Sequence, residues 1–208
     1  MGLARDERAC LADLFTEVGP EAPTLCEGWR TSDLAAHLVI RERRPDTAPG
    51  IVIKPLAGYT ERVRREYAAK PWQELIRLVR TGPPRLSPTS IGPVDELVNG
   101  AEFFVHHEDV RRGAAGWAPR EPDDTRDEQL WRILSRMAKL PFRASPVGVV
   151  LRRTSGAEIA AKRGPDTVTI SGEPGELLLF AFGRDEVEVD FAGEQAAIAR
   201  VRGLKRGL

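Results

Sequence analysis

The stretch that most constrains the fold runs from Glu96 to Arg112 and reads ELVNGAEFFVHHEDVRR. Its apolar side chains recur every three or four residues, which is the period of an amphipathic helix; they are Leu97, Ala101, Phe104 and Val105. Such a helix buries one face against other elements, so the chain needs helical neighbours around it. This helix also carries two of the three histidines, His106 and His107.

Two side chains of this helix have the sequence spacing of ligands that bind one metal ion. Glu102 and His106 are four residues apart, so they stand one turn apart on the same face. The third histidine, His37, lies in the helical segment SDLAAHLVIRER, on a face that its apolar neighbours turn inward. We therefore hypothesise a metal site of His37, Glu102 and His106 between two helices. The alternatives are a solvated Glu–His pair and a hydrogen-bonded core histidine.

The first part of the chain is otherwise helical. Apolar spacing and breakers predict helices over residues 4–18, 32–44, 58–80 and 96–112. Pro71 divides the third of these, and Thr31 or Ser32 is the expected N-cap of the second. Proline-rich connections over residues 44–57 and 81–93 could rim a site. Helices joined in this way favour an antiparallel four-helix bundle.

The pattern changes in the second part of the chain. After a fifth helix ending near Pro141, short alternating runs predict strands over 147–154, 158–163 and 167–172, separated by turn residues. A helix over 173–183, a strand over 187–193 and a helix over 194–204 follow. The predicted fold class is α+β, with a helical domain over residues 1–141 and a small α+β domain over 142–208.

Composition excludes several classes of protein. The formal net charge is zero and the charges are interleaved, so the basic footprint of a nucleic-acid-binding protein is missing. No apolar run reaches the roughly 20 residues of a membrane helix, and the charged start is unlike a secretory signal. We expect a cytoplasmic protein with no membrane partner. The two cysteines, Cys10 and Cys26, are too few for a disulfide framework, and we expect Cys10 to be buried in the first helix.

Two segments resemble a known family. CEGWRTSDLAAHL (26–38) and AEFFVHHEDVRR (101–112) are similar to the signature segments of the mycothiol-dependent maleylpyruvate isomerase superfamily. The resemblance implies a DinB-like four-helix bundle followed by a sterol-carrier-like α/β domain. It also implies a divalent metal, zinc with nickel as the alternative, held by the residues at the positions of His37, Glu102 and His106.

His107 competes with His106 as the second ligand from this helix. Adjacent helical positions differ by about 100°, so both histidines cannot face one ion equally. We choose His106, because only His106 has the spacing to Glu102 and the family pattern. Whether His107 replaces or joins it is left open by the sequence.

The resemblance implies a function for such a site. Two histidines and one carboxylate leave a coordination position open, as in catalytic zinc sites. The family's co-substrate is the small thiol mycothiol, so we expect a transferase or isomerase in which the metal activates a thiolate toward a small electrophile. The alternatives are a non-catalytic metal- or ligand-binding protein and a stress-related interaction protein on the same fold. We expect a monomer or a homodimer.

Other charged side chains have two interpretations each. The arginines at the end of the second helix, Arg41, Arg43 and Arg44, could bind an anionic substrate or complement the helix dipole. Arg200 and Arg202 could reach a ligand or lie on a solvated face. The last turn of the histidine helix is interpreted as a salt-linked face; its charged residues are Glu108, Asp109, Arg111 and Arg112.

Overall fold

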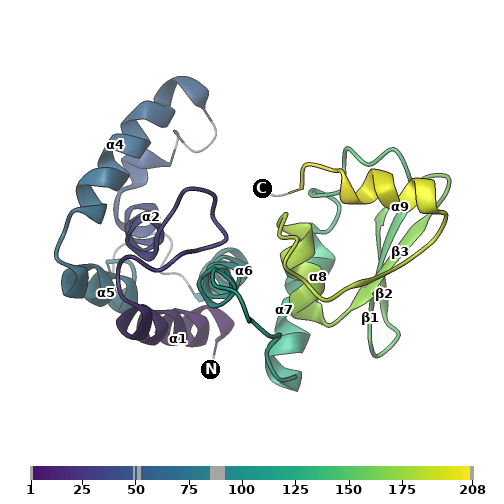
Figure 1. The fold of residues 1–208 in the computed structure, drawn as a ribbon, viewed down its shortest axis with the longest axis horizontal. Helices are drawn as coiled ribbons and strands as arrows, with labels where there is room; N and C mark the ends of the chain where they lie inside the picture. The colour runs from purple at the N-terminus through teal and green to yellow at the C-terminus, as the bar shows by residue number, and fades with distance from the viewer. Residues whose placement is uncertain (1, 49, 51–52, 85–91, 207–208) are drawn as a thin grey trace. The chain divides into compact units, whose positions relative to one another are not determined.

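The chain has an α+β fold, which a computed structural model describes for residues 2–48, 50, 53–84 and 92–206. Within these ranges there are eight α-helices and one four-stranded sheet, which confirms the predicted fold class (Figure 1). The chain divides into two compact units, residues 1–117 and 118–208.

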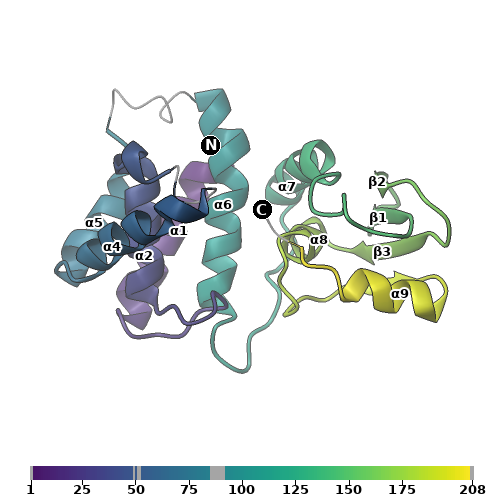
Figure 2. The same cartoon turned by 90° about the horizontal axis from the view of Figure 1, so that it is seen from above.

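The first unit is helical. Its elements are α1 (Leu3–Val18), α2 (Thr31–Arg43), α4 (Ala57–Ala68), α5 (Trp72–Thr81) and α6 (Gly92–Arg111), with 3₁₀ turns η1 (Pro45–Thr47) and η2 (Lys54–Leu56). Helix α1 packs against α5 and α6, whereas α2 packs against α4 and α5 (Figure 2). Apolar residues of α1, α2, α5 and α6 form one core, whose largest buried members include Phe15, Leu34, Leu75 and Phe103.

The helix boundaries follow the breakers in the sequence. Helices α1 and α5 stop at Gly19 and Gly82, whose φ angles of 78° and 67° favour glycine. Pro71 separates α4 from α5, as predicted. The N-cap prediction for α2 is wrong: Arg30 is the N-cap, so Thr31 and Ser32 lie inside the helix. The Thr31 hydroxyl instead donates to the carbonyl of Gly19 at 2.5 Å. The start of α2 is stabilised by its third residue: the carboxylate of Asp33 accepts a hydrogen bond from the Arg30 backbone N–H.

A buried ion pair ties α1 to α2. The Arg8 guanidinium donates to both carboxylate oxygens of Glu42, at 2.6 and 2.5 Å, and to the carbonyl of Val79 in α5. It also lies over the ring of Phe103 in α6, 4.1 Å from the ring centroid. The Arg8 and Glu42 side chains are 9% and 3% exposed, so each charge depends on the other for compensation.

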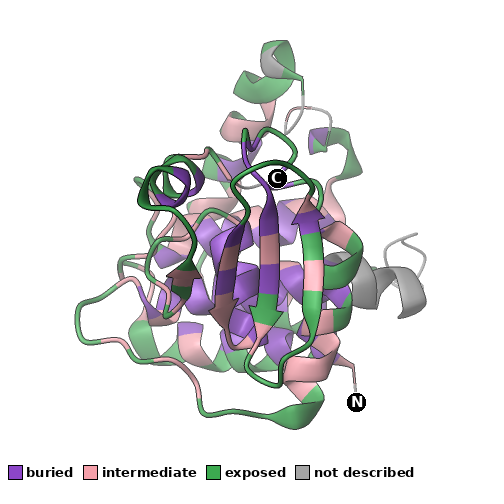
Figure 3. Cartoon of the chain, turned by 90° about the vertical axis from the view of Figure 1, so that its right-hand side faces the viewer, coloured by how far each residue is buried: buried purple, intermediate pink, exposed green. Residues whose placement is uncertain are grey.

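The second unit combines a sheet with three helices. Its elements are α7 (Asp124–Met137), β1 (Val149–Arg153), β2 (Glu158–Lys162), β3 (Val168–Gly172), α8 (Pro174–Ala181), β4 (Asp190–Ala192) and α9 (Gln195–Arg202). The strand order is β2-β1-β3-β4; β1 and β3 are parallel and the two outer pairs are antiparallel. Burial alternates along β1 and β3, so one face of these strands forms the core (Figure 3).

The division between the units differs from the predicted boundary between residues 141 and 142. Helix α8 is buried along all eight residues, which requires cover on more than one side. The sheet covers α8 through β1 and β3, and α7 packs on it as well. Because Leu130 and Leu134 of α7 are fully buried, α7 belongs to the compact second unit and the division falls after Trp117.

Two further expectations can be compared with the structure. The prediction that Cys10 is buried is wrong: the side chain lies on the exposed side of α1, between the buried positions Arg8 and Leu11. The connections over 44–57 and 81–93 lie partly outside the described residues. None of the described helices is long and apolar enough to cross a membrane.

We predict that Glu42→Ala destabilises the protein by about 3–5 kcal/mol, because it leaves the Arg8 charge buried without its carboxylate. Glu21→Ala is the control: its partner Arg30 is 60% exposed, and the loss should stay below about 1 kcal/mol. Urea unfolding followed by circular dichroism measures both. Equal losses in the two variants would contradict the role of the buried pair.

A second prediction concerns the unit boundary. A fragment of residues 118–208 should unfold cooperatively on heating, because it keeps α7 on α8. A fragment of residues 142–208 exposes the apolar side of α8 that α7 covers, and it should not fold. Calorimetry distinguishes the two. A cooperative transition in the shorter fragment would favour the boundary predicted from the sequence.

Candidate metal centre

Three side chains from two helices meet at one point. The Nε2 atom of His37, on α2, lies 3.4 Å from Oε1 of Glu102, on α6. Nε2 of His106 lies 3.2 Å from the same oxygen, one helical turn further along α6. The three ligand atoms lie within 4.8 Å of one another. The structure thus brings together the three residues of the hypothesised site.

These separations can be compared with two kinds of contact. An N–H···O hydrogen bond most often joins atoms about 2.9–3.0 Å apart. Nitrogen and oxygen ligands that sit about 2.0–2.1 Å from one tetrahedral ion are about 3.3–3.4 Å apart. The two His–Glu contacts, at 3.4 and 3.2 Å, are closer to the second value. The donor set and its spacing therefore fit a divalent cation.

The cluster is largely sheltered from solvent. The side chains of His37 and Glu102 are about one-fifth exposed, and that of His106 is 11% exposed. The Trp29 ring lies beside the His37 ring, with centroids 5.3 Å apart, and the Arg64 guanidinium lies over the Trp29 ring. Trp29 thus packs beside His37 at the start of α2.

Burial and neighbouring charges shift the pKa values of the side chains in the cluster. Burial lowers the pKa of His37; the hydrogen bond with Glu102 offsets part of this effect, and the charge of the neighbouring His106 lowers the pKa further. Burial alone would raise the pKa of Glu102, but hydrogen bonds from His106 and His37 and the charge of Arg41 hold this pKa well below its usual value. The carboxylate is therefore ionised, which is the form that binds a cation.

Arg41 is the nearest arginine to the cluster. Its Nε lies 3.4 Å from Glu102 Oε1, and its guanidinium donates to the side-chain oxygen of Asn99. The other two arginines of the helix end have local partners, since Arg43 donates to the Gly82 carbonyl and Arg44 binds Asp46. Of the three, Arg41 alone contacts a candidate ligand in the described structure.

His106 has an outer contact that the sequence interpretation missed. Its Nδ1 lies 2.9 Å from Oδ2 of Asp109, a fully buried carboxylate one turn further along α6. Burial alone would lower the pKa of His106, but hydrogen bonds with Asp109, Cys26 and Glu102 raise it well above its usual value. Asp109 is therefore not part of a solvated salt-linked face. The i,i+3 spacing from His106 was the available sequence signal.

Cys26 is the second missed residue. Its thiol donates to Asp109 Oδ2 at 3.3 Å and lies 4.0 Å from His106 Nδ1. The loop before α2 reaches this position because the Leu25 N–H bonds to the Asp109 carbonyl. A side chain at Gly113 would come within 2.2 Å of the Pro23 carbonyl, so glycine is needed for the close approach. This long-range contact has no spacing signal in the sequence.

His107 contacts a different helix. Its Nδ1 lies 2.9 Å from a carboxylate oxygen of Glu7 on α1, and both side chains are buried. The geometry therefore puts His106 in the cluster and His107 in a separate pair. The neighbouring Glu108 does form the predicted salt links, to Arg111 and Arg112, although it is fully buried.

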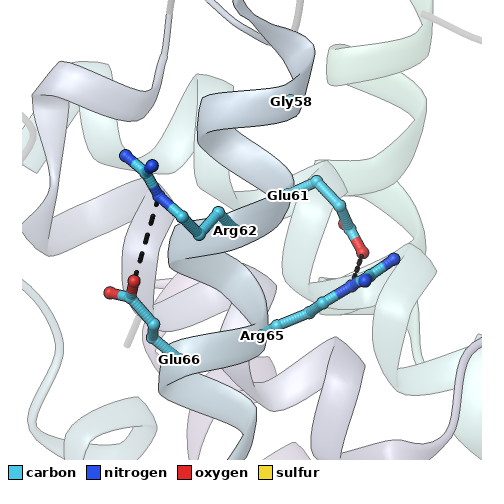
Figure 4. A pocket seen from close by; sticks show the side chains of 5 residues that line it. All are labelled: Gly58, Glu61, Arg62, Arg65 and Glu66. Carbon is cyan, nitrogen blue, oxygen red and sulfur yellow. Dashed lines mark hydrogen bonds and ion pairs between the residues drawn. The ribbon is translucent and has the colours of Figure 1, made fainter.

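The remaining candidates lie on exposed faces. Arg200 and Arg202 of α9 are exposed, and Arg202 lies over the ring of Phe191 in the same unit. A shallow hollow on α4 is lined by Gly58 and by two ion pairs, Glu61–Arg65 and Arg62–Glu66 (Figure 4). These pairs have the i,i+4 spacing of a solvated helix face, so this hollow offers no converging ligands.

Comparison with known proteins gives a match in structure and none in sequence. No protein-family profile matches the chain, and no curated protein does. Crystal structures of a mycothiol-dependent maleylpyruvate isomerase, and of a variant with one histidine replaced by alanine, match at a TM-score of 0.62. Each match has 18% identity and covers 92% of this chain and 91% of the isomerase chain. The chain therefore shares the fold of a mycothiol-dependent maleylpyruvate isomerase across both of its units.

Proposed function

We propose that the protein binds one divalent cation, zinc in preference to nickel, through His37, Glu102 and His106. The observation that carries the proposal is the convergence of two imidazole Nε2 atoms on one carboxylate oxygen at ligand-like separations. Imidazole nitrogen and carboxylate oxygen form the ligand set of many catalytic zinc sites. The two histidines lie on different helices, α2 and α6, whose apolar residues share one core.

We further propose that the bound cation serves a thiol-dependent transferase or isomerase with mycothiol as co-substrate. The support is the shared fold with an isomerase whose name states its dependence on mycothiol. Three protein ligands leave a coordination position for a small molecule. A divalent cation supplies positive charge that lowers the pKa of a thiol bound to it, so that a thiolate is available near neutral pH.

The chain's own residues would then orient the reactants. Trp29 limits the approach of water on the His37 side of the cluster. Glu102 stays ionised and balances part of the cation's charge. Arg41, held beside Glu102 by Asn99, carries a positive charge toward an anionic electrophile that approaches the cluster. The bundle and the second unit would correspond to the DinB-like and sterol-carrier-like layout of the resembled family.

We expect about one zinc ion per chain in protein purified or reconstituted with zinc, and its loss in His37→Ala and in Glu102→Gln, because each removes one of three ligands. Elemental analysis measures the content, and circular dichroism verifies the fold. His107→Ala is the matched control, since its histidine is adjacent on α6 but pairs with Glu7. Zinc content that stays at the wild-type level in folded His37→Ala would overturn the site.

We expect zinc-loaded protein to isomerise maleylpyruvate, or to transfer mycothiol to another small electrophile, only when both mycothiol and zinc are present. Glu102→Gln should lower the rate to that of the reaction without protein, since the cation is no longer held. Product formation is followed by chromatography with and without a chelator. Zinc binding without turnover of mycothiol and a panel of electrophiles would instead support a non-catalytic metal-binding protein.

A further inference from the structure

The two ring nitrogens of His106 contact two different carboxylates. Nε2 faces Glu102 at 3.2 Å, on the side of the proposed cation, whereas Nδ1 faces Asp109 at 2.9 Å. The Asp109 oxygen that contacts His106 also accepts from the Cys26 thiol at 3.3 Å. The Asp109 side chain is completely buried, so this contact lies behind the cluster and away from solvent.

From this geometry we infer that Asp109 is the positioning residue of the cation site: it holds a hydrogen of His106 on Nδ1, so that Nε2 is the nitrogen that binds the cation. A carboxylate oxygen that already accepts from a thiol acts on the ring as an acceptor, so Nδ1 must donate. When a cation takes the place of the proton on the other nitrogen, Nε2 offers its lone pair to that cation, beside Glu102 and His37. This inference rests on the proposed function, because it assigns the outer partner of a ligand of that same site.

The separations argue against a second ion between Asp109 and His106. Nitrogen and oxygen ligands of one tetrahedral zinc ion are about 3.3–3.4 Å apart, whereas these two atoms are 2.9 Å apart, the length of an ordinary hydrogen bond. Cys26 Sγ lies 4.0 Å from Nδ1, which is wider than about 3.6 Å for sulfur and nitrogen on one such ion. The Cys26 side of the ring is therefore a hydrogen-bonded support.

The neighbouring pair on α6 provides a matched control. His107 Nδ1 also lies 2.9 Å from a buried carboxylate, that of Glu7, whereas the group of His37, Glu102 and His106 contains the adjacent histidine. The two pairs thus have the same chemistry, the same separation and similar burial. They differ in whether the histidine belongs to the proposed site, so Glu7→Gln controls for the general cost of altering a buried His–carboxylate pair.

The test compares zinc affinity in wild type, Asp109→Asn, Asp109→Ala and Glu7→Gln by competition with a chromophoric chelator, with folding checked by circular dichroism. We expect Asp109→Asn to lose about 10–100-fold in affinity and Asp109→Ala at least as much. Glu7→Gln should keep the wild-type affinity. Asp109→Asn is nearly isosteric, so it serves as the test even where Asp109→Ala does not fold.

A second readout reports directly on the ring. In zinc-loaded wild type, the ¹⁵N chemical shifts of His106 should show hydrogen on Nδ1 and metal on Nε2. Failure of the proposed function and failure of this inference give different results. Wild type that binds no zinc overturns both; wild type that binds zinc while folded Asp109→Asn binds it equally tightly, or with Nδ1 of His106 on the metal, overturns the role of Asp109 alone.

Discussion

The first unit depends on the pairing of polar side chains that α6 buries between the other helices. Within about two turns α6 carries a glutamate, two histidines, a second glutamate and an aspartate, all sheltered from solvent. A buried polar or charged group without a partner costs roughly 1–3 kcal/mol or more, so each of them requires a partner. Helix α1 supplies Glu7, α2 supplies His37, and the loop before α2 supplies Cys26.

These contacts form two sets. In the inner set His37 and His106 contact Glu102, and in the outer set His106 contacts Asp109 and His107 contacts Glu7. The contacts of His37 and His106 with Glu102, at 3.4 and 3.2 Å, are longer than the outer contacts of His106 with Asp109 and of His107 with Glu7, which are both 2.9 Å. The same helix therefore holds one set at the spacing of ligands and the other set at the spacing of hydrogen-bonded supports. The inner spacing is compatible with the proposed cation.

Local patterns predicted the elements well, and the long-range contacts poorly. Apolar periodicity and breakers located the helices and the three strands after residue 147, because these signals lie within single elements. The boundary after residue 141 differed from the division after Trp117, since packing of α7 on α8 is a tertiary choice. The N-cap of α2 and the burial of Cys10 were wrong for the same reason, because neighbouring elements decide both.

The sequence predicted the three proposed ligands, but it did not predict Asp109 and Cys26, which support His106. Glu102 and His106 have a helical spacing, and His37 is the remaining histidine, on the inward face of a second helix. The resemblance to a known family supported all three. Asp109 was interpreted as part of a salt-linked face because charges at that spacing usually lie on a solvated surface. Cys26 depends on the loop before α2 approaching Gly113 closely, a contact that no local pattern encodes.

The most direct test of the account is the zinc X-ray absorption spectrum of protein loaded with one equivalent of zinc in the absence of small thiols. The account predicts nitrogen and oxygen neighbours at about 2.0–2.1 Å, with the outer-shell scattering of two imidazole rings and no sulfur. A sulfur neighbour at about 2.3 Å would place the ion at Cys26, and a spectrum without imidazole scattering would remove the histidines from the site. Either result would contradict the proposed centre of His37, Glu102 and His106.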